Sequence, residues 1–131
     1  MCKALLVTLL AVVSSSAAAE WVRVGSNTTG TMYADPTTIR RAGGRVKMWN
    51  LVDFKTLQTD GGDSYLAKKE LDEYDCEEEQ WRLLYVSRHS ENMGGGQVTY
   101  SSSSPIDWRP VPPGSGAAIL WKIACGEPRR H

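Results

Sequence analysis

The sequence contains few of the residues on which metal sites and acid–base catalysis depend. It has three cysteines and two histidines in 131 residues, and His89 is the only histidine apart from the terminal His131. A zinc site uses several cysteine or histidine ligands at short spacings, and a histidine base needs a partner nucleophile. Neither pattern is present in the sequence. We therefore expect no metal, no cofactor and no enzyme activity, with His89 at the surface end of a strand.

The sequence also lacks an excess of charge of either sign. It contains fifteen Lys and Arg residues and fifteen Asp and Glu residues. A chain without a strong positive charge is a poor candidate for binding nucleic acid or an anionic membrane. The acidic residues between Glu70 and Glu79 lack the glycine and the alternating oxygen ligands of a calcium loop. We expect them to form a solvated face and turn.

Long hydrophobic runs are absent except near the amino terminus. Lys3 precedes an apolar run from Ala4 to Val13, and small residues follow as far as Ala19. This pattern is typical of a signal peptide over residues 1–19, and the run is too short to span a bilayer. Cys2 lies before the run, so it is not placed as the lipid-accepting cysteine of a lipoprotein. We expect an exported, periplasmic or secreted protein without a membrane span after cleavage.

Removal of residues 1–19 leaves two cysteines, Cys76 and Cys125. Two cysteines in a small exported domain predict one disulfide. In the chain-entropy model, a disulfide between these two cysteines stabilises the fold by about 4 kcal/mol. The remaining 112 residues are expected to form one domain over residues 20–126, followed by a flexible tail at 127–131.

Strand patterns dominate the domain. Residues 45–55 alternate with Val46, Met48 and Asn50 on one face and apolar groups on the other, which is typical of a strand covered on both sides. Further strands are expected at 81–89 and, shorter, at 21–24, 32–34 and 97–100. Turns are expected at Asp35–Pro36 and in the hairpin loop 59–63.

Two later segments give less uniform patterns. Residues 65–76 fit a strand by alternation, whereas the spacing of Lys69 and Glu73 and the local propensity slightly favour a helix. Residues 116–124 predict a helix, because Ser115 is a good amino-terminal cap and Gly126 stands where a helix ends.

One tryptophan is a candidate for ligand binding. The sequence has five tryptophans, and those in strands and on the helix are expected mainly in the core. Trp108 instead lies in a loop rich in serine and proline between 101 and 113, next to Arg109. Trp108 and Arg109 are therefore the candidate ligand contacts.

An ordered set of short motifs resembles the surface-adhesin protein E family. The motifs run through the chain in order: Trp21-Val22-Arg23-Val24, Tyr33-Ala34-Asp35, Val46 to Phe54, Glu73-Tyr74-Asp75-Cys76, Trp81-Arg82-Leu83-Leu84, Trp108, Pro113-Gly114-Ser115 and Ala124-Cys125-Gly126. The resemblance therefore extends over residues 21–126, nearly the whole domain.

This resemblance implies an α+β fold in a bacterial exported protein. The expected fold is an antiparallel sheet of about six strands, with one carboxy-terminal helix held on its concave face by the Cys76–Cys125 disulfide. Residues 65–76 would then form a strand. The resemblance also implies a non-catalytic, adhesin-like binding domain that engages host or envelope proteins through its exposed sheet face and loops. Extracellular-matrix or serum proteins are the ligands that the resemblance suggests, and a homodimer is expected. The alternative is a small periplasmic envelope protein with a structural or stress-related role that shares only the fold.

Overall fold

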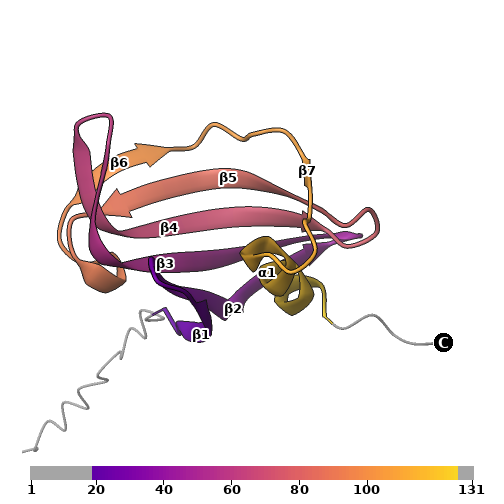
Figure 1. Cartoon of the computed structure of the whole chain (residues 1–131). Coiled ribbons are helices and arrows are strands. Elements are labelled where there is room, and N and C mark those ends of the chain that lie inside the picture. Colours follow the sequence, from indigo (N-terminus) through magenta and orange to yellow (C-terminus); the bar gives the residue numbers. More distant parts are fainter. Residues whose placement is uncertain (1–18, 127–131) are drawn as a thin grey trace, which may run out of the picture.

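A computed structural model describes residues 19–126 of the chain (Figure 1). The expected tail at 127–131 and the expected signal peptide, apart from Ala19, lie outside these residues. The described elements are, in chain order, β1 (Val22–Ser26), β2 (Gly30–Ala42), β3 (Arg45–Asp60), β4 (Asp63–Asp75), β5 (Gln80–His89), the short 3₁₀ helix η1 (Asn92–Gly94), β6 (Val98–Ser102), β7 (Arg109–Pro110) and α1 (Gly116–Cys125).

The first six strands form one antiparallel sheet in which each strand pairs with the next along the chain. The two-residue strand β7 pairs with the start of β5, whereas β6 pairs with its end. Tight turns join β2 to β3 at Gly43 and β3 to β4 at Gly61 and Gly62, where the positive φ angles favour glycine. The expected sheet with one carboxy-terminal helix is confirmed.

Strand β4 decides between the two predictions for residues 65–76. It pairs with β3 on one side and with β5 on the other, so its backbone groups are used by the sheet. The strand is therefore confirmed, and the helical spacing of Lys69 and Glu73 is incidental. Beyond Asp53 the register between β3 and β4 shifts until Gln58, and the tip of this hairpin curls away from the sheet at the left of Figure 1.

The expected turn at Asp35–Pro36 is wrong. Strand β2 continues through Pro36 to Ala42, although its pairing with β3 is interrupted between Asp35 and Arg40. Proline has no backbone N–H to donate, so it fits such an interruption. Inside the gap, the backbone N–H of Trp49 donates to Thr38 Oγ1 at 3.0 Å. Pro36 therefore marks an irregularity within a strand.

The hydrophobic core lies between α1 and one face of the sheet. Its buried members are Ala34, Val46, Met48, Tyr74, Leu120 and Ala124. All five tryptophans are partly buried, and Trp81 and Trp121 pack against this cluster. None of the five is a fully buried core residue.

Helix α1 is fixed at both ends. Ser115 Oγ accepts the N–H of Ala118 at 3.1 Å, as an amino-terminal cap does. Near the other end, the Cys76–Cys125 disulfide joins the turn after β4 to the last helical residue, with 5.6 Å between the two Cα atoms. Arg41 also donates to the carbonyl oxygen of Ala124 at 3.1 Å. The predicted helix and the predicted disulfide are both confirmed.

The segment after β5 lies against β3 and β4. Leu51 of β3 is fully buried. Gly94 of η1 lies close to it, since a Cβ atom added at this glycine would be 3.5 Å from the Leu51 side chain. Asp53 holds η1 in place by accepting the side-chain amide of Asn92 at 2.9 Å and the backbone N–H of Met93 at 2.7 Å. The two sides of β3 are thus covered by different segments. No helix within residues 19–126 is long and apolar enough to cross a membrane.

Candidate functional site

Trp108 lies within cation–π distance of two arginines from distant parts of the sequence. The guanidinium carbon of Arg45 is 5.1 Å from the centroid of its indole ring, and that of Arg82 is 4.7 Å away. Both distances are within the range of cation–π attraction. Trp108 is partly buried in this arrangement. We call Arg45, Arg82 and Trp108 the arginine–tryptophan stack.

The sheet and the edge strand position the stack. Arg45 begins β3, Arg82 lies on β5, and β7 pairs with β5 directly after Trp108, which places the indole beside them. Glu73 Oε1 accepts Arg82 Nε at 2.8 Å and Nη2 at 2.7 Å, so Arg82 is held by a carboxylate. The exposed Arg45 has no ion-pair partner within residues 19–126. Its guanidinium group therefore packs against the Trp108 ring without a carboxylate partner among these residues.

The structure separates the two predicted contact residues. Arg109 is exposed and pairs by register with Trp81. Because neighbouring strand residues point to opposite sides, Arg109 does not join the stack that contains Trp108. The sequence reasoning missed Arg45 and Arg82, because no local motif connects them to Trp108, which lies 26 or more residues away in the sequence.

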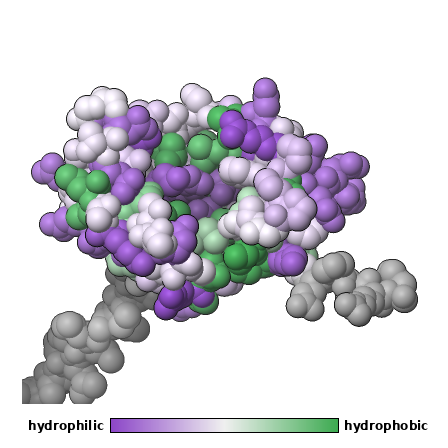
Figure 2. Space-filling view, in the orientation of Figure 1, coloured by the Kyte–Doolittle hydropathy of each residue, from purple (hydrophilic) through white to green (hydrophobic). Residues whose placement is uncertain are grey.

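A cleft of about 460 Å³ lies beside the amino-terminal end of α1. Its apolar lining comes from Met32, Val52, Phe54 and Ile119, and glycines of β1, β2 and the helix start provide the remaining backbone surface. Ile119 is 40% exposed. In Figure 2 hydrophobic surface gathers over α1, and hydrophilic groups lie in the hollow between the helix and the curled hairpin. The cleft is a second concave surface, separate in its lining residues from the arginine–tryptophan stack.

The expectation that the acidic stretch is a solvated face is wrong for Asp72 and Glu73, which are 2% and 7% exposed. Burial and the charge of Glu70 raise the pKa of Asp72 from 3.8 to about 8. Asn50 Nδ2 donates to Asp72 Oδ2 at 2.7 Å. At neutral pH the Asp72 carboxyl group is therefore largely protonated.

His89 is buried rather than at the surface, and this corrects the expectation for the histidine. It is 6% exposed, and its Nε2 lies 2.8 Å from Ser87 Oγ. Burial, together with the charge of Lys69, lowers its pKa. Ser87 and His89 lie within hydrogen-bond distance of each other, but both are buried side chains of β5. Neither side chain is therefore open to solvent. Within residues 19–126, no three His, Cys, Asp or Glu side chains are grouped as metal ligands.

The fold and these surfaces define a small disulfide-bonded domain in which a sheet and one helix present open contact surfaces. The sequence profile of the surface-adhesin protein E family matches residues 21–126, and the chain therefore belongs to this family. Membership supports an adhesin-like exported protein. The resemblance recognised in the sequence is confirmed.

Solved structures show the same fold. The structure of crystal form II of Haemophilus influenzae protein E superposes with a TM-score of 0.63 at 12% identity, covering 80% of this chain and 86% of that chain. Protein E from non-typeable Haemophilus influenzae gives a TM-score of 0.60 at 12% identity, covering 85% and 78%. At this identity the likeness concerns the fold alone. No curated protein matches the chain.

Proposed function

We propose that this chain is an exported, non-catalytic binding module that captures an acidic segment of another protein through the arginine–tryptophan stack. The observation that carries the proposal is that two guanidinium groups lie within cation–π distance of the Trp108 indole, and that one of them, Arg45, lacks a carboxylate partner within residues 19–126. Family membership supports an adhesin-like role. We expect the ligand to be an extracellular-matrix or serum protein.

The chemistry of the stack supports this choice. Tryptophan and arginine are among the residues most enriched at positions that dominate protein–protein binding energy. A guanidinium group can bind a carboxylate through two parallel hydrogen bonds. Trp108 and Arg82 are already positioned by β5 and Glu73, so little conformational freedom is lost on binding.

A binding assay with the domain from Glu20 onward tests the proposal. Purified extracellular-matrix and serum proteins are immobilised, and binding is measured at low and high salt. We expect salt-sensitive binding to at least one of them, reduced about tenfold or more by Arg45→Ala or Trp108→Ala. Arg109→Ala should weaken it less. The matched control is Arg23→Ala, which removes an exposed arginine of β1, the strand at the opposite edge of the sheet from β6.

Two results would contradict the stack as the contact surface. One is binding that survives both substitutions while the unfolding temperature is unchanged. The other is binding that is lost on Ile119→Glu, which places a charge in the cleft beside α1, but not on Arg45→Ala. Sedimentation of the same samples tests the homodimer, which stays a prediction.

Cell fractionation tests the location on which adhesion depends. Adhesion to host proteins requires that the domain reach the outside of the cell, either secreted or on the surface. We expect added protease to reach it in intact cells, or the protein to be found in the medium. Strict confinement to the periplasm would contradict adhesion and favour the structural or stress-related envelope role.

A further inference from the structure

Asp35 is a buried carboxylate that holds the segment preceding β1. Asp35 is 2% exposed. Asp35 Oδ2 accepts the backbone N–H of Glu20 at 3.1 Å, and Oδ1 accepts that of Thr37 at 3.1 Å. The hydroxyl group of Thr37 also donates to Oδ1. The carboxylate thus joins the irregular part of β2 to a residue fifteen positions earlier.

No cation neutralises this carboxylate within residues 19–126. The donors to Asp35 are neutral, and none of the four ion pairs in that range includes it. Lys69 contributes to the same cavity of about 250 Å³, together with Ala19 and Trp21, but its ammonium group is not within ion-pair distance of Asp35. A buried carboxylate without a counter-charge is costly.

The atom that Asp35 contacts is the one that cleavage after Ala19 would convert into a cation. Hydrolysis of the Ala19–Glu20 peptide bond consumes one water molecule, leaving a carboxylate on Ala19 and an α-amino group on Glu20. That amino group is protonated below pH of about 8. A neutral amide donor at 3.1 Å would become a charged donor, and charge-assisted hydrogen bonds are shorter and stronger.

We propose that Asp35 is the receptor for the amino terminus made by signal cleavage after Ala19, and that the Glu20 α-ammonium group forms a partly buried ion pair with it. The geometry is selective, because a cut one residue earlier or later moves the ammonium group by about 3.3 Å along an extended chain. The inference rests on the export of the proposed function, but it is independent of what the domain binds.

The first test locates the cut. The full-length chain is expressed in a bacterium, the exported protein is recovered, and its intact mass and amino-terminal sequence are determined. We expect a chain that begins at Glu20. A chain that begins at any other residue would overturn the proposal, whatever ligand the domain binds.

The second test measures the ion pair. The unfolding temperature of the chain from Glu20 is compared with that of its Nα-acetylated form, each with Asp35 or with the substitution Asp35→Asn. We expect acetylation to lower the unfolding temperature by about 5 °C or more with Asp35, and by a small fraction of that in the Asp35→Asn variant. Because the carboxylate raises the pKa of the paired amino group, the acetylation effect should be present at pH 6 and be lost only as pH rises beyond about 8.

Lys69→Gln provides the matched control, since Lys69 is the basic side chain that lines the cavity beside the amino terminus. The acidic side chain of Glu20 is present in all forms. The acetylation effect should persist in this variant. Equal acetylation effects with and without Asp35 would overturn the proposal. If Asp35→Asn fails to fold, a chain with one glycine added before Glu20 decides. It should be less stable than the chain from Glu20, and equal stability would overturn the proposal.

Discussion

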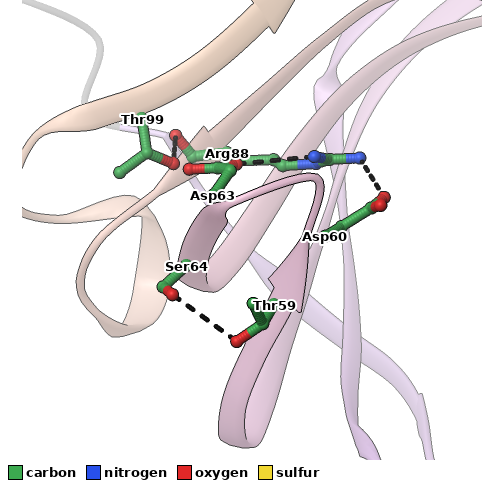
Figure 3. A network of polar contacts seen from close by, with 6 residues as sticks. All are labelled: Thr59, Asp60, Asp63, Ser64, Arg88 and Thr99. Atoms are coloured by element: carbon green, nitrogen blue, oxygen red, sulfur yellow. Dashed lines mark hydrogen bonds and ion pairs between the residues drawn. The ribbon is translucent and has the colours of Figure 1, made fainter.

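The two ends of the sheet are held together by different chemistry. At one end, which we call the helix-clamped end, α1 buries the apolar cluster around Tyr74 and the Cys76–Cys125 bond ties the helix to the sheet. At the other, the curled end, the β3–β4 hairpin tip is held by charges. Arg88 Nη2 lies 3.0 Å from Asp60 Oδ2, and Nη1 lies 3.4 Å from Asp63 Oδ2 (Figure 3).

Aromatic rings complete the curled end. The guanidinium carbon of Arg88 is 4.8 Å from the ring centroid of Tyr65 and 4.7 Å from that of Tyr100. Its Nε atom is buried and has no hydrogen-bond partner within residues 19–126. The helix-clamped end therefore depends on apolar burial and a covalent bond, whereas the curled end depends on one cation whose desolvation is only partly compensated.

The largest effect is expected from breaking the bond at the helix-clamped end. Replacing both Cys76 and Cys125 by alanine should lower the free energy of unfolding by about 4 kcal/mol. The disulfide joins residues 49 positions apart, and without it the unfolded chain regains the conformational entropy that this closed loop removes. Urea unfolding of the oxidised protein and the double variant measures this. Reductant should destabilise the unsubstituted protein and leave the variant unchanged. A loss below about 1 kcal/mol would show that apolar contacts alone fix the helix.

A smaller loss, of about 2 kcal/mol in the free energy of unfolding, is expected when pH is raised, because Asp72 loses its proton. Its folded-state pKa is raised to about 8, so the protonated form stabilises the fold at low pH and this contribution is lost as pH rises toward 8. Between pH 6.5 and 8 the loss amounts to about 2 kcal/mol. Urea unfolding at both pH values should show this loss in the unsubstituted protein and little change in Asp72→Asn.

The pH window avoids the main competing group. The pKa of His89 is lowered from 6.5, so its contribution falls as pH drops below that value, opposite in sign to the contribution of Asp72. If the Asp72→Asn variant loses as much stability as the unsubstituted protein between pH 6.5 and 8, another group causes the dependence.

The curled end should be weakened by removing its cation. Arg88→Met keeps most of the apolar stem and removes the guanidinium group, and we expect a loss of about 2 kcal/mol in the free energy of unfolding, because Asp63 is left partly buried without a partner. Asp60→Asn is the matched control. The Asp60 side chain is 65% exposed, so its loss should cost less than about 0.5 kcal/mol. Equal losses in the two variants would contradict the comparison.

The smallest effect is expected at the helix cap. Ser115→Ala removes the acceptor for the N–H of Ala118 and should cost about 1 kcal/mol. Thermal unfolding measures the loss, with the exposed Ser103→Ala in the preceding connection as the control. No difference between the two variants would mean that the disulfide, rather than the cap, determines the stability of α1.

Local pattern was sufficient for several elements. The alternation of residues 45–55 identified β3 and its buried residues Val46, Met48 and Asn50. Ser115 and Gly126 marked the limits of α1. These predictions hold because strand alternation and helix capping are properties of neighbouring residues.

Local pattern failed where a distant segment covers a polar side chain. His89 and Asp72 looked like surface residues, because nothing beside them in the sequence shows what packs over them. The expected turn at Pro36 failed for a related reason, since the interruption in the β2–β3 pairing that accommodates it involves residues of both strands. The sequence alone left residues 65–76 open between strand and helix, and pairing on both sides decided it.

The sequence by itself determined the short-range framework: the alternating strands, the capped helix, and the cysteine pair that joins them. Only the tertiary structure decided which polar groups are buried and which distant residues meet, as Trp108 meets Arg45 and Arg82. The physical reason is that alternation shows which residues share a face of a strand, whereas burial and electrostatics depend on the segment that the fold places over that face.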